Sequence, residues 1–304
     1  MKGRNETVQG GGAGAVCTGG AEESYAGTGA TGGAAPPRWA LWQVLDSAFP
    51  AGGFNHSLGL EAALRSGSVP TPAHLEGAVR SALANVAASQ MPLTLAAYDA
   101  AVCAEAAARA RMGAGARGVA ELSSMWEAAA GEAMRACGVA AALCACNSVA
   151  LEAAAAQGKS LLRAVCAAFA DSGEGSALGC AVRALRVASE ADGAPAAHPA
   201  VVMGFALAAA GVTRDEAARA PLFAALRDVL AAATRLNALG PLAAAAAHAR
   251  AASCAEALAL EYIEVDARRK AEGLPLHERC ALAAPLMDVL QGGHDEMFTK
   301  LFCS

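Results

Sequence analysis

Two glycine-containing strings in the sequence resemble loops that bind phosphate groups. Residues 27–32 read GTGATG, the pattern of a dinucleotide-binding turn, and Gly158-Lys159-Ser160 resembles the end of a P-loop. Such turns aim backbone amides at a phosphate when a strand precedes them and a helix follows. The first string lies in a segment that predicts neither element, and the second follows a helix-type run at residues 151–156. We expect no nucleotide site; a helical nucleotide-binding protein or enzyme that uses Gly158-Lys159-Ser160 is the alternative.

Histidines and cysteines show no spacing typical of a metal centre or of catalysis. The six histidines are isolated from one another, and the ten cysteines are scattered apart from the pair Cys144 and Cys146. The patterns H-E-x-x-H, C-x-x-C and G-x-S-x-G do not occur. We therefore predict no catalytic residue, no metal site and no cofactor. The cysteines are interpreted as small core residues, and His294-Asp295 as a polar cap beside a glycine break.

Two arginines on one expected helix are the best candidates for recognition of carboxylates. Arg227 and Arg235 are eight residues apart with Ala231 between them, so they share the helix face opposite a leucine stripe. An ordinary solvated face would explain this spacing. A tight contact with another helix or with a partner would explain it equally well.

The last residues of the chain are unusually apolar. Met297, Phe298, Leu301 and Phe302 have the spacing of one face of a helical turn. Chain ends fray unless they dock, so these side chains predict contact either with the protein's own core or with a partner groove.

Composition predicts the elements that must position these residues. Alanine dominates a hydrophobic fraction of 55%, aromatic residues make up 4%, and Ile263 is the one isoleucine. Alanine favours helices, whereas strands need β-branched and aromatic residues, so the expected fold is all-α. A net charge of −5 without a basic cluster argues against nucleic-acid binding. The longest uncharged stretch holds about a dozen apolar residues, fewer than the ~20 of a membrane span.

The chain divides into a tail and one helical domain. Residues 1–38 are rich in Gly, Ala, Ser and Thr without apolar periodicity, which is typical of disorder. Acidic residues in this tail argue against an organelle transit peptide, and we favour the cytoplasm. Residues 39–304 are expected to form a single domain.

Proline, glycine and capping residues bound the expected helices. In the first helix, Trp39, Trp42, Leu45 and Phe49 are spaced to share one face, and Pro50 ends it. The other expected helices run through residues 58–64, from Thr71 to a break or kink at Pro92, then about 93–111, 119–156, 158–170, 178–187, 198–211, from Thr213, from Pro221 to Gly240, 242–268 and 286–290, with a last turn or two after Gly293.

Four segments match, in order, the motifs of one known family. Residues 45–61 (LDSAFPAGGFNHSLGLE) contain a Pro-x-Gly-Gly-Phe turn followed by Ser-x-Gly-Leu-Glu. Residues 157–163 read QGKSLLR, residues 226–242 contain a basic helix with a Gly-Pro exit, and residues 284–302 contain APL, LQGGHD and TKLF. Together these segments resemble the UreF family of urease accessory proteins over residues 39–304.

The resemblance implies a non-enzymatic helical scaffold that forms a homodimer. It further implies binding to a UreD/UreH-type accessory protein, a UreG-type GTPase and apo-urease, with a role in nickel insertion and in modulating the GTPase. Lys300 stands where the family usually has arginine, which puts bidentate anion recognition there in doubt. The partner-binding residues that the resemblance and the two apolar and basic patterns suggest are Pro50, Gly52, Gly53, Phe54, Ser57, Gly59, Glu61, Arg227, Arg235, Asn237, Gln291, His294, Met297, Phe298, Lys300, Leu301 and Phe302.

Overall fold

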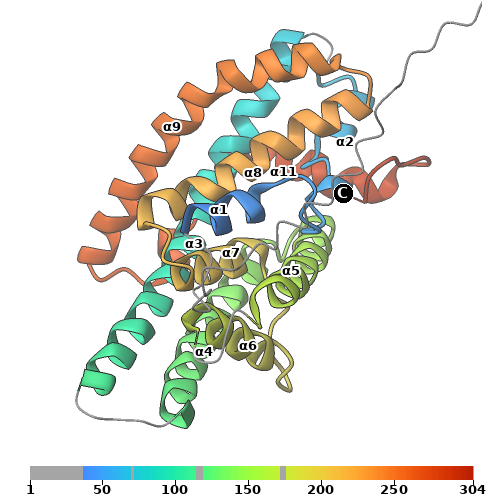
Figure 1. The fold of residues 1–304 in the computed structure, drawn as a ribbon. Helices are drawn as coiled ribbons and strands as arrows, with labels where there is room; N and C mark the ends of the chain where they lie inside the picture. The colour runs from blue at the N-terminus through green and yellow to red at the C-terminus, as the bar shows by residue number, and fades with distance from the viewer. Residues whose placement is uncertain (1–36, 70–71, 114–118, 172–175, 304) are drawn as a thin grey trace, which may run out of the picture. The chain divides into compact units, whose positions relative to one another are not determined.

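The described part of the chain is all-α, as composition predicts. The computed structural model describes residues 37–69, 72–113, 119–171 and 176–303, and no strand occurs among them (Figure 1). The predicted tail, except for its last two residues, and the glycine string at 27–32 lie outside the described residues. The α-helices are α1 Pro37–Leu45, α2 Leu60–Arg65, α3 Pro72–Gly113, α4 Val119–Leu143, α5 Ser148–Phe169, α6 Ala177–Ser189, α7 Pro199–Ala209, α8 Arg214–Arg235, α9 Pro241–Ala271, α10 Leu276–Arg279 and α11 Pro285–Gly292. Two short 3₁₀ helices are η1 Gly53–Asn55 and η2 Gly293–Glu296.

Helix α7 is the central helix of the packing. All of its residues from Ala200 to Ala209 are buried, because its sequence is apolar on every face. Helices α3, α4, α5, α6 and α8 all contact it, and α9 packs on the outer side against α8 and α3 (Figure 1).

Two apolar cores share the long helix α3. One core is formed mainly by α4, α5, α6, α7 and the second half of α3. The other is formed by α2, the first half of α3, α8 and α9, and it includes Phe302 from the end of the chain. The C-terminal segment therefore packs against the second core.

Helix α3 continues through Pro92, where the sequence predicted a break or kink. Proline has no N–H to donate to the carbonyl of residue 88 and its ring crowds that carbonyl. Here the amide of Ala281 donates to the Ala88 carbonyl at 3.0 Å. A distant segment thus satisfies the group that the proline leaves without an intrahelical partner.

Two other predicted helix boundaries are wrong. The expected helix 119–156 ends at Leu143, and α5 begins after Asn147, whose Oδ1 accepts from the Ala150 amide at 3.0 Å. Gly158 lies inside α5. The segment from Thr213 to Asn237 was divided at Pro221, but α8 is one helix that begins with a capping box between Thr213 and Glu216.

The first helix presents a different face from the one predicted. Ala40 and Val44 are buried, whereas Trp39 and Trp42 are 62% and 55% exposed, with ring centroids 5.3 Å apart. The helix ends at Leu45, so Phe49 does not extend its stripe. The small side chain of Ala40 lets α1 approach the core, and the tryptophans are left outside.

Other expectations from the sequence have mixed outcomes. No helix in the described ranges combines the length and apolar character needed to cross a membrane. The nine described cysteines are all free; Cys137, Cys166 and Cys280 are buried, but the remaining six are partly or fully exposed. Burial raises the pKa of the Cys137 thiol to about 11 and that of Cys280 to about 12, which leaves both as unreactive core residues.

Candidate partner-binding site

The turn at residues 50–55 packs directly against helix α8. A Cβ atom at Gly53 would lie 2.2 Å from Oδ2 of Asp228, so only glycine fits here without movement of that carboxylate. Arg227 donates to Asp228 Oδ1 at 2.7 Å and to the Leu45 carbonyl at 2.5 Å. Burial raises the pKa of Asp228 more than its neighbour Arg227 lowers it. The residues of the Pro-x-Gly-Gly-Phe motif therefore form the turn that packs against α8 in this chain.

Arg235 joins this turn to the C-terminal segment. Its guanidinium carbon lies 4.2 Å from the ring centre of Phe54 and 4.3 Å from that of Phe302. Its Nη1 also donates to the Phe54 carbonyl at 2.5 Å. An ordinary solvated face is therefore the wrong interpretation of this helix face, since Arg227 and Arg235 both bind backbone carbonyls of their own chain.

Glu61 is the centre of a buried polar cluster. Its side chain is 0% exposed and contacts four groups, three from the last part of the chain and one from the next helical turn. The amides of Leu301 and Phe302 donate to it at 2.8 and 3.0 Å, Arg65 donates at 3.1 Å, and Nε2 of His294 lies 3.1 Å away. The buried carboxylate thus holds the C-terminal segment by accepting hydrogen bonds from two of its backbone amides.

The electrostatics of Glu61 follow from these contacts. Burial by itself raises the pKa of the carboxyl group. The Leu301 amide, His294, the Phe302 amide and Arg65 together outweigh that effect, so the net pKa lies below its usual value. The group is ionised at neutral pH and needs all of these donors, because a buried carboxylate without partners is strongly destabilising.

The four apolar residues at the chain end do not share a helix face. Helix η2 ends at Glu296 and the following segment is not helical, so the predicted last helical turns are replaced by backbone contacts to Glu61. Phe302 is 5% exposed in the protein's own core, whereas Phe298 is 102% exposed. Contact with the protein's own core is confirmed for Phe302, and contact of Phe298 with a partner stays a prediction.

Exposed apolar side chains gather in the C-terminal region. Among the large hydrophobic residues that remain exposed, a group lies in the last part of the chain: Leu282, Leu286, Val289, Phe298 and Leu301. Phe54, also exposed, stacks on Arg235 next to Phe302. Leu286 and Val289 lie three residues apart on α11 and therefore share one exposed face of that helix.

Comparisons with known proteins decide the family. The UreF family model matches residues 69–252. Urease accessory protein F of Oryza sativa subsp. indica is 31% identical over 266 residues, which covers 88% of this chain and 85% of the rice protein. Urease accessory protein F of Arabidopsis thaliana is 30% identical over 267 residues, 88% of this chain and 92% of the plant protein. The chain belongs to the UreF family. It is an accessory protein and not an enzyme.

Several predicted residues of this UreF-family chain position others and are themselves buried or half-buried. The Ser57 hydroxyl accepts from the Glu61 amide at 3.2 Å, and both residues are buried. Gly59, with a φ of +81°, packs against Gln291 of α11. His294 is buried, and its Nδ1 has no hydrogen-bond partner. These residues build the site, and any contact of theirs with a partner stays a prediction.

The remaining predicted residues lie at or near the surface. Pro50 and Asn237 are exposed, and Asn237, with a φ of +57°, follows the C-cap residue Leu236 of α8. Lys300 pairs with Asp295 at 3.0 Å, which is the single-point contact expected of lysine. Gly52 and Met297 are half-buried.

Sequence reasoning missed residues that complete the site. Arg65 follows Glu61 by one helical turn, and this i, i+4 spacing of opposite charges was an available signal. For Asp228 the only signal in the sequence was its position next to Arg227. The Asn55 carbonyl, which accepts from the Cys303 amide at 2.9 Å, carries no sequence signal because any residue supplies it.

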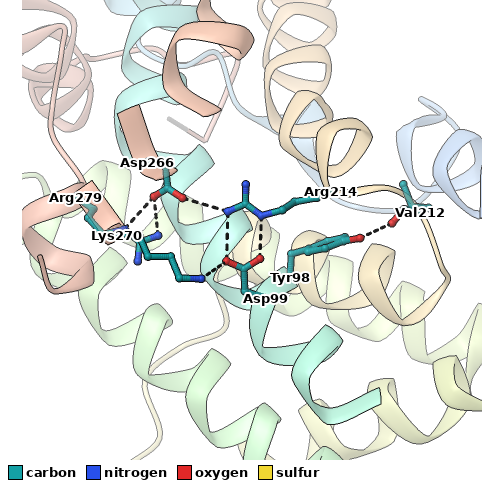
Figure 2. Close-up of polar contacts among 7 residues, drawn as sticks. All are labelled: Tyr98, Asp99, Val212, Arg214, Asp266, Lys270 and Arg279. Carbon is teal, nitrogen blue, oxygen red and sulfur yellow. Dashed lines mark hydrogen bonds and ion pairs between the residues drawn. The ribbon is translucent and has the colours of Figure 1, made fainter. Parts of the chain in front are cut away.

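A second cluster of charges lies near the C-terminal end of helix α9. Figure 2 shows Arg214 between Asp99 and Asp266, with Lys270 on Asp99 and Arg279 on Asp266. Arg279 donates to Asp266 Oδ1 at 2.9 and 2.6 Å, and Lys270 donates to Asp99 at 2.7 Å. These ion pairs connect α3, α8, α9 and α10. No sequence argument identified them.

The P-loop alternative does not fit the structure. Gly158 is buried in the interior of α5, where a Cβ atom would meet the Ala197 carbonyl at 1.7 Å. Its segment is helical on both sides, so its amides are not turned outward to cradle a phosphate. Ser160 instead contacts the turn at Gly52. Among the described residues, no three His, Cys, Asp or Glu side chains are grouped as metal ligands.

Proposed function

We propose that this chain is a scaffold for nickel insertion into urease. In this proposal it joins a UreD/UreH-type accessory protein and a UreG-type GTPase to apo-urease, modulates the GTPase, and works as a homodimer in the cytoplasm. Family membership supports the accessory role, and the free cysteines are those expected in a reducing compartment.

The observation that carries the proposal is the exposed apolar C-terminal surface. Leu286 and Val289 on α11 and Phe298 after η2 present large side chains to solvent. Aromatic and aliphatic anchors of this kind dominate the energetics of protein interfaces. The segment is also fixed in place at Phe302, which reduces the entropy lost when a partner binds.

Exposed Phe298 provides the first test. Because it contacts solvent on all sides, Phe298→Ser should change the free energy of unfolding by no more than about 0.5 kcal/mol. The same variant should weaken co-purification with a UreD-type protein from the same organism by about 10-fold or more, as expected for loss of an interface anchor. Pull-down and thermal melts on one preparation measure both effects.

A matched control is available on α6. Val187 is 65% exposed, and Val187→Ser removes an exposed, smaller apolar group away from the C-terminal segment. It should leave co-purification unchanged. Equal losses for the two variants, or none for Phe298→Ser, would refute the C-terminal surface as the binding site. Addition of the UreG-type GTPase to the same pull-down, with measurement of GTP hydrolysis, tests the ternary complex and the modulation of the GTPase.

A further inference from the structure

We propose that Glu61 is a positioning residue for partner recognition. It holds residues 297–303 in the one conformation that presents Phe298 and Leu301 to a partner. The identity of that partner rests on the proposed function, but the positioning itself can be measured on this chain alone.

The C-terminal segment has few other polar contacts to hold it. After Glu296 it has no helical hydrogen bonds, and the consecutive amides of Leu301 and Phe302 both donate to the Glu61 carboxylate. Arg65, which also binds Glu61, donates to the Thr299 hydroxyl at 2.8 Å. The segment bends at residues 298–299 and 301–302, and it is bound through backbone amides: Glu61 accepts two of them, and the Asn55 carbonyl accepts from the Cys303 amide.

The same contacts determine which side chains face outward. With the Phe302 amide on Glu61, the Phe302 ring packs in the second core and on Arg235. Leu301 remains 48% exposed and Phe298 fully so. If the segment left Glu61, these anchors would lose their defined position, and partner binding would carry the additional entropy cost of ordering them.

Glutamine at position 61 tests the role of the carboxylate. It keeps the shape of glutamate but replaces one acceptor oxygen by an N–H₂ group, which faces an amide donor. In full-length Glu61→Gln, hydrogen exchange at the Leu301 and Phe302 amides should accelerate by about 10- to 100-fold, the range expected for loss of a charged acceptor. Amides of the buried helix α7 should exchange as in wild type, which shows that the fold persists.

Asp295 provides the matched control. Asp295→Asn removes an exposed carboxylate of η2 that pairs with Lys300 of the C-terminal segment. Exchange at Leu301 and Phe302 should stay at the wild-type rate in this variant. If it accelerates equally, general loss of charge explains the effect and the specific role of Glu61 is wrong.

Position 301 provides a test that leaves Glu61 in place. Leu301→Pro removes the amide donor, whereas Leu301→Ala keeps it and removes the same exposed side chain. The proline variant should accelerate exchange at Phe302 and bind the UreD-type partner at least about 10-fold more weakly than the alanine variant. This pair decides the matter even if Glu61→Gln does not fold.

The binding measurements separate this inference from the proposed function. Glu61→Gln should weaken partner binding about 10-fold with an unchanged α7 exchange rate, whereas Phe298→Ser should weaken binding without accelerating exchange at Leu301. Unchanged exchange in Glu61→Gln would overturn the positioning role. Accelerated exchange with wild-type affinity would overturn its part in recognition and leave the proposed function intact. A wild-type chain that binds no UreD-type protein would overturn the proposed function, while the exchange result still reports on Glu61.

Discussion

Two acid clusters in this chain bind different kinds of donor. Asp266 accepts from the side chains of Arg279 and Arg214, which belong to helices α10 and α8. Glu61 accepts from two backbone amides in a non-helical segment next to the C-terminus. The first set of contacts can be lost only when helices separate. The second can be lost while the rest of the fold persists, because chain ends open at low cost.

This difference assigns the two clusters separate roles. Side-chain pairs between α3, α8, α9 and α10 stabilise the helix arrangement (Figure 2). The Glu61 cluster controls the position of a segment that carries exposed apolar residues. A single fold thus contains one charge cluster that should mainly affect stability and another that should mainly affect binding.

The largest expected effect is on stability, from loss of Asp266. This residue is 1% exposed, and Asp266→Ala leaves the buried guanidinium of Arg279 without its partner. We expect a fall in the free energy of unfolding of about 3–5 kcal/mol. Urea denaturation measures it. As a control, Glu256→Ala removes the exposed partner of Arg219 and should cost no more than about 1 kcal/mol. Similar values for the two variants would contradict the structural role of Asp266.

Removal of residues 297–304 should have a smaller effect on stability. Phe302 is the only residue of this segment with a buried side chain among those described, and its loss should cost about 2–3 kcal/mol. The shortened chain should stay helical by circular dichroism and should no longer bind partners. Phe302→Ala in the full-length chain separates core packing from display of Phe298. Global unfolding of the shortened chain would show that this segment is part of the essential core.

An added methyl group at Gly53 should have a smaller effect still. Its Cβ would approach Oδ2 of Asp228 to 2.2 Å, so Gly53→Ala should cost about 1–2 kcal/mol through local displacement of the turn. Asp228→Ala removes the obstructing carboxylate, and the double variant should recover part of the loss. A double-mutant cycle with no coupling would refute this contact.

The smallest expected effect is on the pH dependence of stability. Acid should remove the stabilising contributions of Glu61 and Asp99 over different pH ranges, with little change near neutral pH. Burial raises the pKa of Glu61, but the lowering by its four contacts is larger, so the pKa lies below the ordinary value of 4.5. The Asp99 pKa is likewise below 3.8, because Arg214 and Lys270 outweigh the effect of burial. A lowered folded pKa stabilises the fold above the unfolded value, and this stability is lost as pH falls through the folded pKa.

The measurement compares each wild-type stability with that of an uncharged variant. The difference between wild type and Glu61→Gln should be constant from pH 7 to about 5.5 and shrink as pH falls below 4.5. The difference for Asp99→Asn should begin to shrink only below 3.8. Urea unfolding at several pH values measures both. A Glu61 difference that grows on acidification would contradict the sign of its pKa shift.

Sequence reasoning succeeded where the signal was local. Thr213 and the acids after it predicted the start of α8, because capping residues act within one helical turn. It failed at Pro92, since the Ala281 amide that satisfies the Ala88 carbonyl lies far along the chain. It failed again at Asn147, whose capping role was hidden within an alanine-rich run.

The sequence predicted which residues belong to the candidate site, but not how they contact one another. Motifs in the sequence identified Glu61, Arg235 and the C-terminal residues as related, but they gave no indication that one carboxylate binds the last amides. They also placed Phe298 and Phe302 on one face, although the backbone contacts of the segment put them in opposite environments.

The all-α fold class and most helix ends were determined by the sequence alone, because helix propensity and capping depend on residues within about four positions. The tertiary structure alone decided the Glu61 cluster, since Glu61 and Leu301 are separated by 240 residues. It also decided that Arg235 lies between two aromatic rings from opposite ends of the domain. Contacts between such distant residues depend on how the helices pack, and no local pattern encodes that packing.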